Sequence, residues 1–598
     1  MIELLNSLNP DQRQVVEHRG HCLTIACPGS GKTKTLATKA AVLLEQGERV
    51  CAVTFTRDAA LELRHRTISM AGAGAKVRLL VGTFHSVSML MASPGKRSEF
   101  GRAILADMHS PFTEPWNIVK EGVRLGYLNR AIKESGTKFS WKDATALIEE
   151  TKAAGSAELL EPDARILVET YCALMNAAGQ IDFQDIILKT NAALRDGTLS
   201  PLQVDHLLID EYQDTDEAQY EWSRHHAKAG VALTVVGDDD QSIYAFRRAL
   251  GYAGMDRFAT EFNAMRVLLG TNYRCRSEIL AAAERLISHN TQRIEKSLVA
   301  HKGEGGIVSF EAFKDAFTEY AAVAEEAAVA WADEASFAVI ARTNDELTEL
   351  QAAMVTRGVP YRKTDGRSIF DCPEVQVYAA LLRSIVKPQP NDIDQALAWA
   401  GMTLDDTAEV RALFGSNVRI GSADDFRGTR MSAKGIDVWR SFAKKHAAWT
   451  THHENGHLAI MNHGVWEWLD DTLQKPANPT ILAVAQRMYE VSEGTLKAHL
   501  DRLRESERNQ KQSERDDKTG EPGFAAWLTT AHGSKGLEFD RVWVVGLQSG
   551  SFPSDKSSLE EERRLMFVAM TRAREVLNIS ATREKKPSLF ISESGLSI

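Results

Sequence analysis

The sequence predicts an α/β protein with two parallel-sheet lobes, each interrupted by a largely helical insertion. Short apolar runs recur along the chain and are separated by stretches with helical periodicity. Short strands that are apolar throughout and alternate with helices are typical of parallel sheets covered on both faces. At 598 residues, the chain is also too long for one hydrophobic core.

The apolar runs form two series, and each series predicts one sheet. The first consists of CLTIAC (22–27), VCAVTF (50–55), HLLID (206–210) and LTVVG (233–237). The second consists of FAVIA (337–341), VWVVG (542–546) and VLNIS (576–580).

Two long segments, 88–178 and 373–520, have a helical pattern and no such runs. We interpret both as insertions within the lobes. The second ends in a charged stretch, which predicts a solvated helix followed by a flexible return. The expected lobes are therefore 1–87 with 179–264, and 265–372 with 521–598.

Composition favours a cytoplasmic globular protein. Hydrophobic residues make up 43% and charged residues 25% of the chain, and no apolar run is long enough to span a bilayer. The N-terminus does not resemble a signal peptide. The six cysteines lack zinc spacing and fit reduced thiols in the cytosol. The net charge of −10 does not indicate a nucleic-acid partner, but a local basic groove remains compatible with it.

The segment ACPGSGKT (26–33) follows an expected strand and precedes an expected helix, which is the context of a phosphate-binding loop. Its backbone N–H groups would surround a β-phosphate at the helix N-terminus. Lys32 would add positive charge near the β- and γ-phosphates, and the Thr33 hydroxyl would ligate Mg²⁺. The alternative is an ordinary glycine turn. The expected nucleotide-binding residues here are Ala26, Cys27, Pro28, Gly29, Ser30, Gly31, Lys32, Thr33 and Lys34.

The segment LLIDEYQDTDEAQ (207–219) places two acids at the end of a buried strand. Asp210 would hold Mg²⁺, directly or through water. Glu211 would orient and deprotonate the attacking water. The alternative is that these acids only cap a following helix.

The segment VVGDDDQSIYAFRRA (235–249) becomes polar directly after a strand. Gln241 is placed to sense the γ-phosphate. Tyr244 and Phe246 lie two residues apart, so in an extended segment they would form a base-stacking platform on one side. Taken alone, such an aromatic pair belongs more often to a core.

Together these motifs resemble those of the superfamily 1 DNA helicases of the UvrD/Rep/PcrA family, from Leu8 to about Phe590. That resemblance implies two RecA-like motor domains, an ATP-dependent helicase activity and a DNA-stimulated ATPase. The further matching segments, in family order, are LNPDQRQVV (8–16), VTFTRDAALELRHR (53–66), GTFHS (82–86), IDFQDII (181–187), LLGTNYRCRSEI (268–279), AVIARTN (338–344), LTTAHGSKGLEFDRVWVVG (528–546) and EERRLMFVAMTRARE (561–575).

For the nucleotide, the resemblance implies that Gln12 reads adenine, Tyr273 stacks on it and Glu538 meets the ribose. Arg274 and Arg572 would clamp the γ-phosphate from the second lobe. The alternative for Arg572 is a surface salt bridge. The catalytic set is then Lys32, Glu211, Gln241, Arg274 and Arg572.

For single-stranded DNA, the resemblance implies contacts with bases and contacts near the backbone. The residues expected at the bases are Phe55, Phe183, Tyr244 and Phe246. Those expected at the backbone or stacked nearby are Thr83, His85, Arg342, Asn344 and His532. The alternative for His85 and His532 is a place in the core.

These sites predict a motor in which ATP closes the cleft between the lobes and hydrolysis reopens it. The resemblance implies 3′-to-5′ movement on single-stranded DNA and unwinding of 3′-tailed duplex DNA, in repair, recombination or replication. The alternative is a DNA-stimulated ATPase that acts as a sensor or regulatory subunit with weak unwinding and with a separate nuclease, as in phage defence. The protein partner expected in either case is a nuclease or a loader. A non-hydrolysing clamp is a third class, which Glu211, Gln241 and Arg572 argue against.

The chain departs from the family pattern at several positions. Cys27 replaces a glycine, Lys34 an arginine, Phe246 a tryptophan and Arg248 a glycine. Relatives carry a strand-separating hairpin with an aromatic tip after the last motif. Here VLNISATREKKPSLF (576–590) is short and has no aromatic residue before its last position. We therefore expect translocation with weak or partner-dependent unwinding.

The histidine-rich stretch 446–463 permits two interpretations. His452, His453 and His457 could bind a metal ion, although no cysteine or recognisable ligand spacing accompanies them. We favour a solvated or partner-facing loop.

Overall fold

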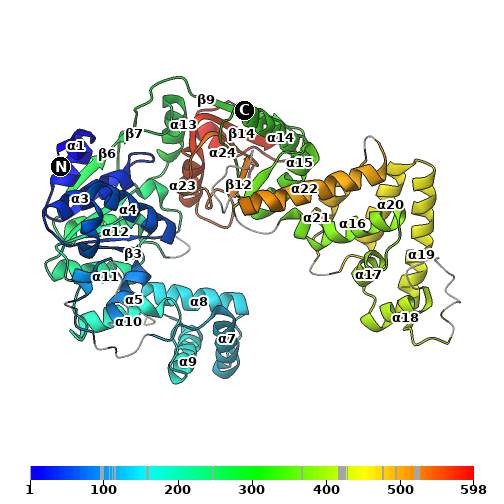
Figure 1. Ribbon diagram of the computed structural model, residues 1–598, viewed down its shortest axis with the longest axis horizontal. Helices are drawn as coiled ribbons and strands as arrows, with labels where there is room; N and C mark the ends of the chain where they lie inside the picture. Colours follow the sequence, from blue (N-terminus) through cyan, green and yellow to red (C-terminus); the bar gives the residue numbers. More distant parts are fainter. Residues whose placement is uncertain are drawn as a thin grey trace. The chain divides into compact units, whose positions relative to one another are not determined.

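The chain folds into two compact units, Met1–Gly305 with Ser557–Phe567 and Gly306–Lys556 with Val568–Ile598. Figure 1 shows the computed structural model, coloured along the sequence. The structure describes residues 2–93, 100–106, 108–110, 112, 116–155, 160–244, 248–364, 368–414, 426, 428–474, 477–491, 494–516 and 526–597.

The first unit contains a six-stranded sheet in the order β3-β2-β4-β5-β1-β6, and every neighbouring pair is parallel. Parallel strands place all their carboxyl ends at one edge, where ligands of α/β proteins bind. The strands are β1 (Cys22–Ala26), β2 (Val50–Thr54), β3 (Leu79–Thr83), β4 (His206–Ile209), β5 (Ala232–Gly237) and β6 (Met265–Leu269).

Helices cover both faces of this sheet. In β1, Leu23 and Ile25 enter one apolar cluster, whereas Cys22 and Ala26 enter another. This alternation explains why the strands are apolar throughout, as the sequence predicted.

The first unit's helices outside its insertion are α1 (Ile2–Asn6), α2 (Pro10–Glu17), α3 (Lys32–Glu45), α4 (Arg57–Ala71), η1 (Ala73–Arg78), α5 (Phe84–Ala92), α6 (Arg102–Leu105), α10 (Asp185–Arg195), η2 (Tyr212–Asp214), α11 (Glu217–Lys228), η3 (Asp239–Gln241), α12 (Gly251–Glu261) and α13 (Ser277–Ile287).

The first helical insertion has a small core of its own. Its helices are α7 (Glu121–Ser135), α8 (Trp141–Ala154) and α9 (Pro162–Ala177), and their cluster includes Leu128, Ile148 and Tyr171. The expected start at residue 88 is too early, because α5 continues to Ala92 and packs Met91 into the core of the first sheet.

The second unit repeats the design, with parallel strands in the order β11-β12-β10-β13-β14-β9. Two parallel sheets thus confirm the predicted fold class. The strands are β9 (Ile307–Phe313), β10 (Phe337–Ala341), β11 (Tyr361–Lys363), β12 (Ala526–Thr530), β13 (Phe539–Val544) and β14 (Ala573–Thr582). The helices of this unit's sheet layer are α14 (Ala316–Ala332), α15 (Asn344–Arg357), η5 (Ile369–Asp371) and α24 (Leu589–Glu593). Helix α23 (Leu559–Met570) belongs to the first unit as far as Phe567.

The second helical insertion shares one continuous core with its sheet. A single cluster runs from Val339 and Leu528 in the sheet to Trp439 and Trp468 in the insertion. The insertion helices are α16 (Pro373–Val386), α17 (Pro390–Trp399), α18 (Leu404–Phe414), α19 (Ala433–Glu454), α20 (Leu458–Asp471), α21 (Pro479–Met488) and α22 (Leu496–Asp516).

The boundary expected between residues 264 and 265 stays a prediction, although the compact unit that holds the first sheet extends beyond it. Strand β6 pairs with β1 and so completes the first sheet. A short parallel pair, β7 (Thr271–Asn272) with β8 (Val299–Ala300), follows it, and the first unit continues to Gly305. Local apolar character could not reveal which sheet this strand joins.

The histidine-rich stretch forms two helices instead of the favoured loop. His446 is buried on α19 at helical spacing from Phe442 and Trp449, which fixes this stretch against the core. The ring centroids of His452 and His457 are 6.0 Å apart, but His452, His453 and His457 do not form a metal-sized cluster; within the described ranges, only Asp238, Asp239 and Asp240 do.

Among the residues that the structure describes, none of the helices combines the length and apolar character that crossing a bilayer requires.

Candidate nucleotide and nucleic-acid sites

The loop between β1 and α3 has the backbone shape of a phosphate-binding loop. Gly29 and Gly31 have φ values of 62° and 80°, which side chains other than glycine rarely adopt. A Cβ at Gly29 would lie 2.7 Å from the Cβ of Arg274, and one at Gly31 would lie 2.9 Å from Gln12 Nε2. Glycine is therefore favoured at both positions by conformation and is required at Gly29 also by space.

Hydrogen bonds fix this loop at several points. Cys27 N–H donates to the Leu269 carbonyl at 3.1 Å, which ties the loop after Ala26 to β6. Gln12 Nε2 donates to the Ser30 carbonyl at 2.9 Å. Lys34 Nζ donates to the Ser7 carbonyl at 2.7 Å. These bonds attach the loop to β6, to α2 and to the segment that precedes α2.

The loop presents donors suited to a phosphate. The N-terminus of α3, which includes Lys32 and Thr33, carries no side-chain cap. Ser30 Oγ is buried, and no described residue bonds to it. Orphan helix N–H groups and an unsatisfied buried hydroxyl together fit an anionic ligand.

Of the two acids after β4, Glu211 contacts Lys32. Lys32 Nζ donates to Glu211 Oε1 at 3.3 Å. Glu211 has a φ of 51°, and this left-handed conformation turns the chain sharply after the strand. The preceding Asp210 is buried, and its Oδ1 accepts the Glu211 N–H at 2.9 Å. Left-handed non-glycine residues cost about 1–3 kcal/mol and cluster at functional sites.

Gln213 connects these acids to the loop after β5. Its Nε2 donates to Glu211 Oε2 at 2.6 Å, and its Oε1 accepts the Asp238 N–H at 2.9 Å. Gln241 Nε2 in turn donates to Asp238 Oδ2 at 2.5 Å. A continuous hydrogen-bonded chain therefore joins Lys32 to Gln241.

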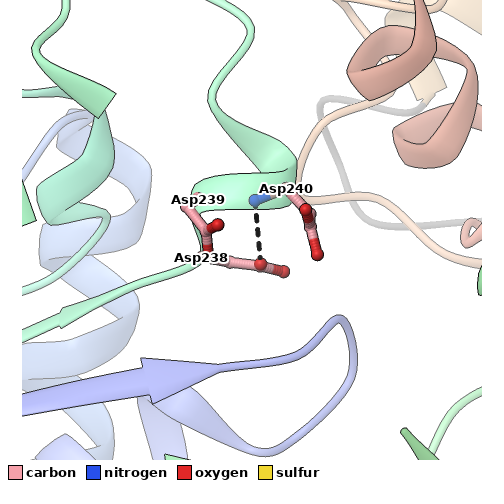
Figure 2. A group of neighbouring side chains, drawn as sticks. All are labelled: Asp238, Asp239 and Asp240. Carbon is pink, nitrogen blue, oxygen red and sulfur yellow. Dashed lines mark hydrogen bonds between the residues drawn. The ribbon is translucent and has the colours of Figure 1, made fainter. Parts of the chain in front are cut away.

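Three buried carboxylates project from the turn after β5, as Figure 2 shows for Asp238, Asp239 and Asp240. Lys296 Nζ lies among them, at 2.5, 2.7 and 3.0 Å from one oxygen of each. Although burial by itself lowers the pKa of Lys296, the surrounding carboxylates raise it overall. The cation at the centre of this cluster is thus a lysine side chain.

Tyr273 and Arg274 lie against the phosphate loop, within the first compact unit. The expectation that Arg274 belongs to the second lobe stays a prediction. Asn272 Nδ2 donates to the Pro28 carbonyl at 2.7 Å, and Tyr273 N–H donates to the Gly29 carbonyl at 2.9 Å. The half-exposed Tyr273 ring is held by an Asn9 Nδ2 bond to its hydroxyl at 2.9 Å. These bonds attach the segment to the loop after β1.

The second unit brings Glu538 and Arg572 together. The buried Arg572 guanidinium donates to the Val568 carbonyl at 2.8 Å and the Leu537 carbonyl at 3.1 Å. The surface salt bridge considered for Arg572 is therefore wrong. Glu538 Oε1 accepts from Arg574 Nη2 at 2.6 Å.

The aromatic residues expected at DNA lie near the carboxyl edge of the first sheet. Phe183 is 51% exposed, and its ring stacks on His85 at 3.9 Å with an interplanar angle of 16°. Burial lowers the pKa of His85 to about 4, so this ring is neutral near pH 7. Phe55 packs edge-on against Phe84, and Thr83 Oγ1 accepts the Ser86 N–H as the N-cap of α5.

In the second unit, Arg342, Asn344 and His532 follow two neighbouring parallel strands. Ala341 ends β10 and pairs with Thr530 at the end of β12. Arg342 and Asn344 therefore share one sheet edge with His532. Tyr244 is half-buried just after the Gln241 turn, whereas Phe246 lies outside the described residues.

Sequence reasoning missed several residues that build these sites. Gln213 and Asn272 lie within the motifs that carry Glu211 and Tyr273. Their place in these motifs could have identified them as site residues. Asn9 begins the segment that carries Gln12. Lys296 had no local signal, because in RIEKSL it has the appearance of a solvated charge.

The fold and the first site define a P-loop nucleotide-binding protein with two parallel-sheet lobes. The family model described as the UvrD/REP helicase N-terminal domain matches residues 8–262. The UvrD-like helicase C-terminal domain matches residues 267–395 and 487–584. The chain therefore belongs to the UvrD/Rep family of ATP-dependent DNA helicases.

Relatives match over nearly their whole length. ATP-dependent DNA helicase Rep of Escherichia coli is 28% identical, with 98% of this chain and 94% of the relative covered. DNA helicase II of the same organism is also 28% identical, with 99% and 88% covered. ATP-dependent DNA helicase UvrD1 of Mycobacterium tuberculosis is 28% identical, with 97% and 82% covered.

Proposed function

We propose that this protein uses ATP hydrolysis to move 3′-to-5′ along single-stranded DNA and to unwind 3′-tailed duplexes. The observation that carries this proposal is the bonded chain from Lys32 through Glu211 and Gln213 to Asp238 and Gln241. It joins a phosphate loop, an acid and an amide, which are the groups needed to bind a triphosphate, activate water and detect the γ-phosphate.

Each residue has a distinct proposed role in hydrolysis. Lys32 binds the β- and γ-phosphates, and Glu211 accepts a proton from the attacking water. Gln241 senses whether a γ-phosphate is bound. Arg274 and Arg572 stabilise the negative charge that develops in the transition state. Preorganised charges of this kind supply much of the rate in phosphoryl transfer.

Thr33 and Asp210 would hold Mg²⁺. A hydroxyl and a buried carboxylate are hard oxygen donors, which suit this ion. When bound, the ion would neutralise charge on the phosphate oxygens. Gln12 would read the adenine, Tyr273 would stack on it, and Glu538 would meet the ribose.

We propose DNA contacts in each unit by itself: a stacking surface in the first unit and polar groups in the second. Phe183, supported by His85, offers an exposed ring face that any base can stack on. Arg342, Asn344 and His532 would contact the backbone. Sequence-tolerant stacking is what a translocating motor requires.

A second candidate is a DNA-stimulated ATPase with weak unwinding that works with a separate nuclease or loader. The segment after α23 favours it. In residues 573–597, the chain forms the core strand β14 and the short helix α24, without an aromatic-tipped hairpin. Phe590 is fully buried and packs edge-on against Phe552.

The test measures ATP hydrolysis with and without single-stranded DNA, beside unwinding of duplexes with a 3′ or a 5′ tail. Stimulation with unwinding from the 3′ tail alone supports the first proposal. Stimulation without unwinding of either duplex supports the second. Turnover that DNA does not change would contradict both.

A further inference from the structure

The irregular segment 290–296 between α13 and β8, here called the strap, contacts two functional regions of the first unit. Its C-terminal end holds the acidic turn Asp238–Gln241. Its N-terminal end holds the first turns of α23, the helix that leads to Arg572. The two sets of contacts involve different atoms and different residues.

At the acidic turn, the strap supplies two cations and one backbone donor. Lys296 is fully buried and lies within 3.0 Å of all three carboxylates. Arg293 donates to both oxygens of Asp240, at 3.0 and 2.7 Å. Ile294 N–H donates to Asp239 Oδ2 at 2.7 Å. Three adjacent buried carboxylates repel one another, so this turn depends on the strap for its charge balance.

The strap reaches Gln241 through one shared carboxylate. Asp238 Oδ1 accepts from Lys296 Nζ, while Asp238 Oδ2 accepts from Gln241 Nε2. A displacement of Lys296 would therefore move the carboxylate that orients the Gln241 amide. Lys296 acts on Gln241 through Asp238 and is a positioning residue.

At α23, the strap bonds to both backbone and side chain. Asn290 Nδ2 donates to the Glu560 carbonyl at 2.9 Å. The Thr291 N–H and Oγ1–H both donate to Glu560 Oε1, at 3.0 and 2.8 Å. Arg564 Nη2 donates to the Gln292 carbonyl at 2.9 Å. The start of α23 is thus fixed to the strap on more than one side.

Helix α23 is continuous from Leu559 to Met570, although the division between the compact units falls within it, after Phe567. Arg572 follows the helix by two residues. A helix transmits displacement along its axis because its backbone bonds make it stiff. A movement of the strap at Asn290 would therefore displace the first turns of α23, the helix that precedes Arg572 in the chain.

We propose that the strap is a coupling element that links the orientation of Gln241 to the position of α23. The inference rests on the proposed function, because it assumes that Gln241 and Arg572 both take part in ATP hydrolysis. Asn290 and Thr291 are its positioning residues at α23, and Lys296 and Arg293 are those at the acidic turn.

The first test removes the α23 contacts and leaves the buried cluster intact, in the full chain carrying Asn290→Ala and Thr291→Val. We expect kcat of DNA-stimulated ATP hydrolysis to fall ~10-fold with KM for ATP within about twofold, because geometry is lost while the phosphate loop is intact. The control is Ser288→Ala, whose exposed hydroxyl bonds only to the Arg285 carbonyl in α13. Normal kcat in the double variant would overturn the inference.

The second test addresses the buried end, where Lys296→Met alone leaves uncompensated charge and could prevent folding. Lys296→Met with Asp239→Asn removes one positive and one negative charge, so the net charge of the cluster is unchanged. A folded variant with kcat reduced ~10-fold supports a positioning role. A folded variant with normal kcat would show that Lys296 only balances charge and would overturn it.

Amide hydrogen exchange separates this inference from the proposed function, since it needs no turnover. In Asn290→Ala/Thr291→Val, we expect faster exchange both at α23 and in peptides covering 237–242. Unchanged exchange at 237–242 would overturn the coupling even if the wild-type protein hydrolyses ATP. Absence of wild-type hydrolysis with coupled exchange would instead contradict only the proposed function.

Discussion

At the scale of single residues, the nucleotide site depends on a few side chains whose positions are set by backbone strain and buried hydrogen bonds. Glu211 faces Lys32 because its left-handed conformation turns the chain after β4. Gln213 then holds the Glu211 carboxylate from the other side. A short, strained turn gives an orientation that a flexible loop would not maintain.

We predict that Glu211→Gln retains ATP binding but lowers kcat by about 10²–10⁴-fold, the usual contribution of a general base. Lys32→Ala should abolish measurable turnover. Steady-state hydrolysis beside equilibrium binding of a fluorescent ATP analogue checks both. Glu217→Gln is the matched control, because that acid only forms an exposed ion pair with Arg257. Normal turnover in Glu211→Gln would remove this residue from the base role.

Phe183 offers the clearest test of the stacking surface. Its exposed ring lies on His85 and has a face available to a base. We predict that Phe183→Ala weakens single-stranded DNA binding by about 1–3 kcal/mol, measured by fluorescence anisotropy with a homopolymer. Phe317→Ala, at an equally exposed ring on α14, is the control. Equal affinities for the two variants would contradict a role for Phe183 in DNA binding.

At the scale of elements, a buried charge network fixes the first insertion to the segment that returns to the sheet. Lys152 on α8 donates to Asp182 at 2.7 Å and to Asp185 at 2.7 Å. Tyr171 on α9 donates to the same Asp182 carboxylate at 3.0 Å. Because Phe183 lies between the two acids, the network also determines where its ring is presented.

Lys152→Met should therefore destabilise α8 and α9 by about 3–5 kcal/mol, since it leaves two carboxylates without their buried cation. Tyr171→Phe should cost less, about 1–2 kcal/mol, for one lost hydrogen bond. Hydrogen exchange of the α8 and α9 amides measures both. Lys133→Met, at an exposed position near the end of α7, is the control. Full protection in Lys152→Met would show that the network is not needed for the insertion.

At the scale of the whole molecule, buried histidines make stability depend on pH. Burial lowers the pKa of His226 to about 4, and the same cause lowers the pKa of His446 to about 4. The unfolded chain binds these protons near pH 6.5, whereas the native chain does not bind them until about pH 4. Their contribution to stability is therefore present above pH 6.5 and is lost as pH falls from 6.5 to 4.

We predict that the thermal midpoint falls between pH 7 and pH 5 and that His226→Gln makes this fall shallower. Burial raises the pKa of Asp216 to about 6, which acts in the opposite direction and makes comparison with the variant necessary. Differential scanning fluorimetry at several pH values measures the slope. A variant with the wild-type slope would show that His226 does not contribute.

Features set by residues close together in the sequence could be predicted, whereas features set by contacts between distant segments could not. The phosphate loop and the strands β1, β2, β4, β5, β10, β13 and β14 were predicted, because each carries a local pattern, whereas β3, β6, β9, β11 and β12 were absent from the two series of apolar runs. The place of β6 was not, because pairing with β1 is decided across more than 200 residues of chain. The histidine-rich stretch 446–463 was mistaken for a loop within a segment predicted to be helical, since its polar residues obscured the helical spacing of the buried Phe442, His446 and Trp449.

The fold class, the family and most of the candidate site residues could be predicted from the sequence, because each motif lies within a short segment whose chemistry is local. The contacts that join those segments became visible only in the folded structure. It placed Arg274 beside Gly29, inserted Gln213 between two motifs and brought Lys296 into a cluster of aspartates. Such contacts depend on burial and on distances in the folded chain, which cannot be inferred from residues adjacent in the sequence.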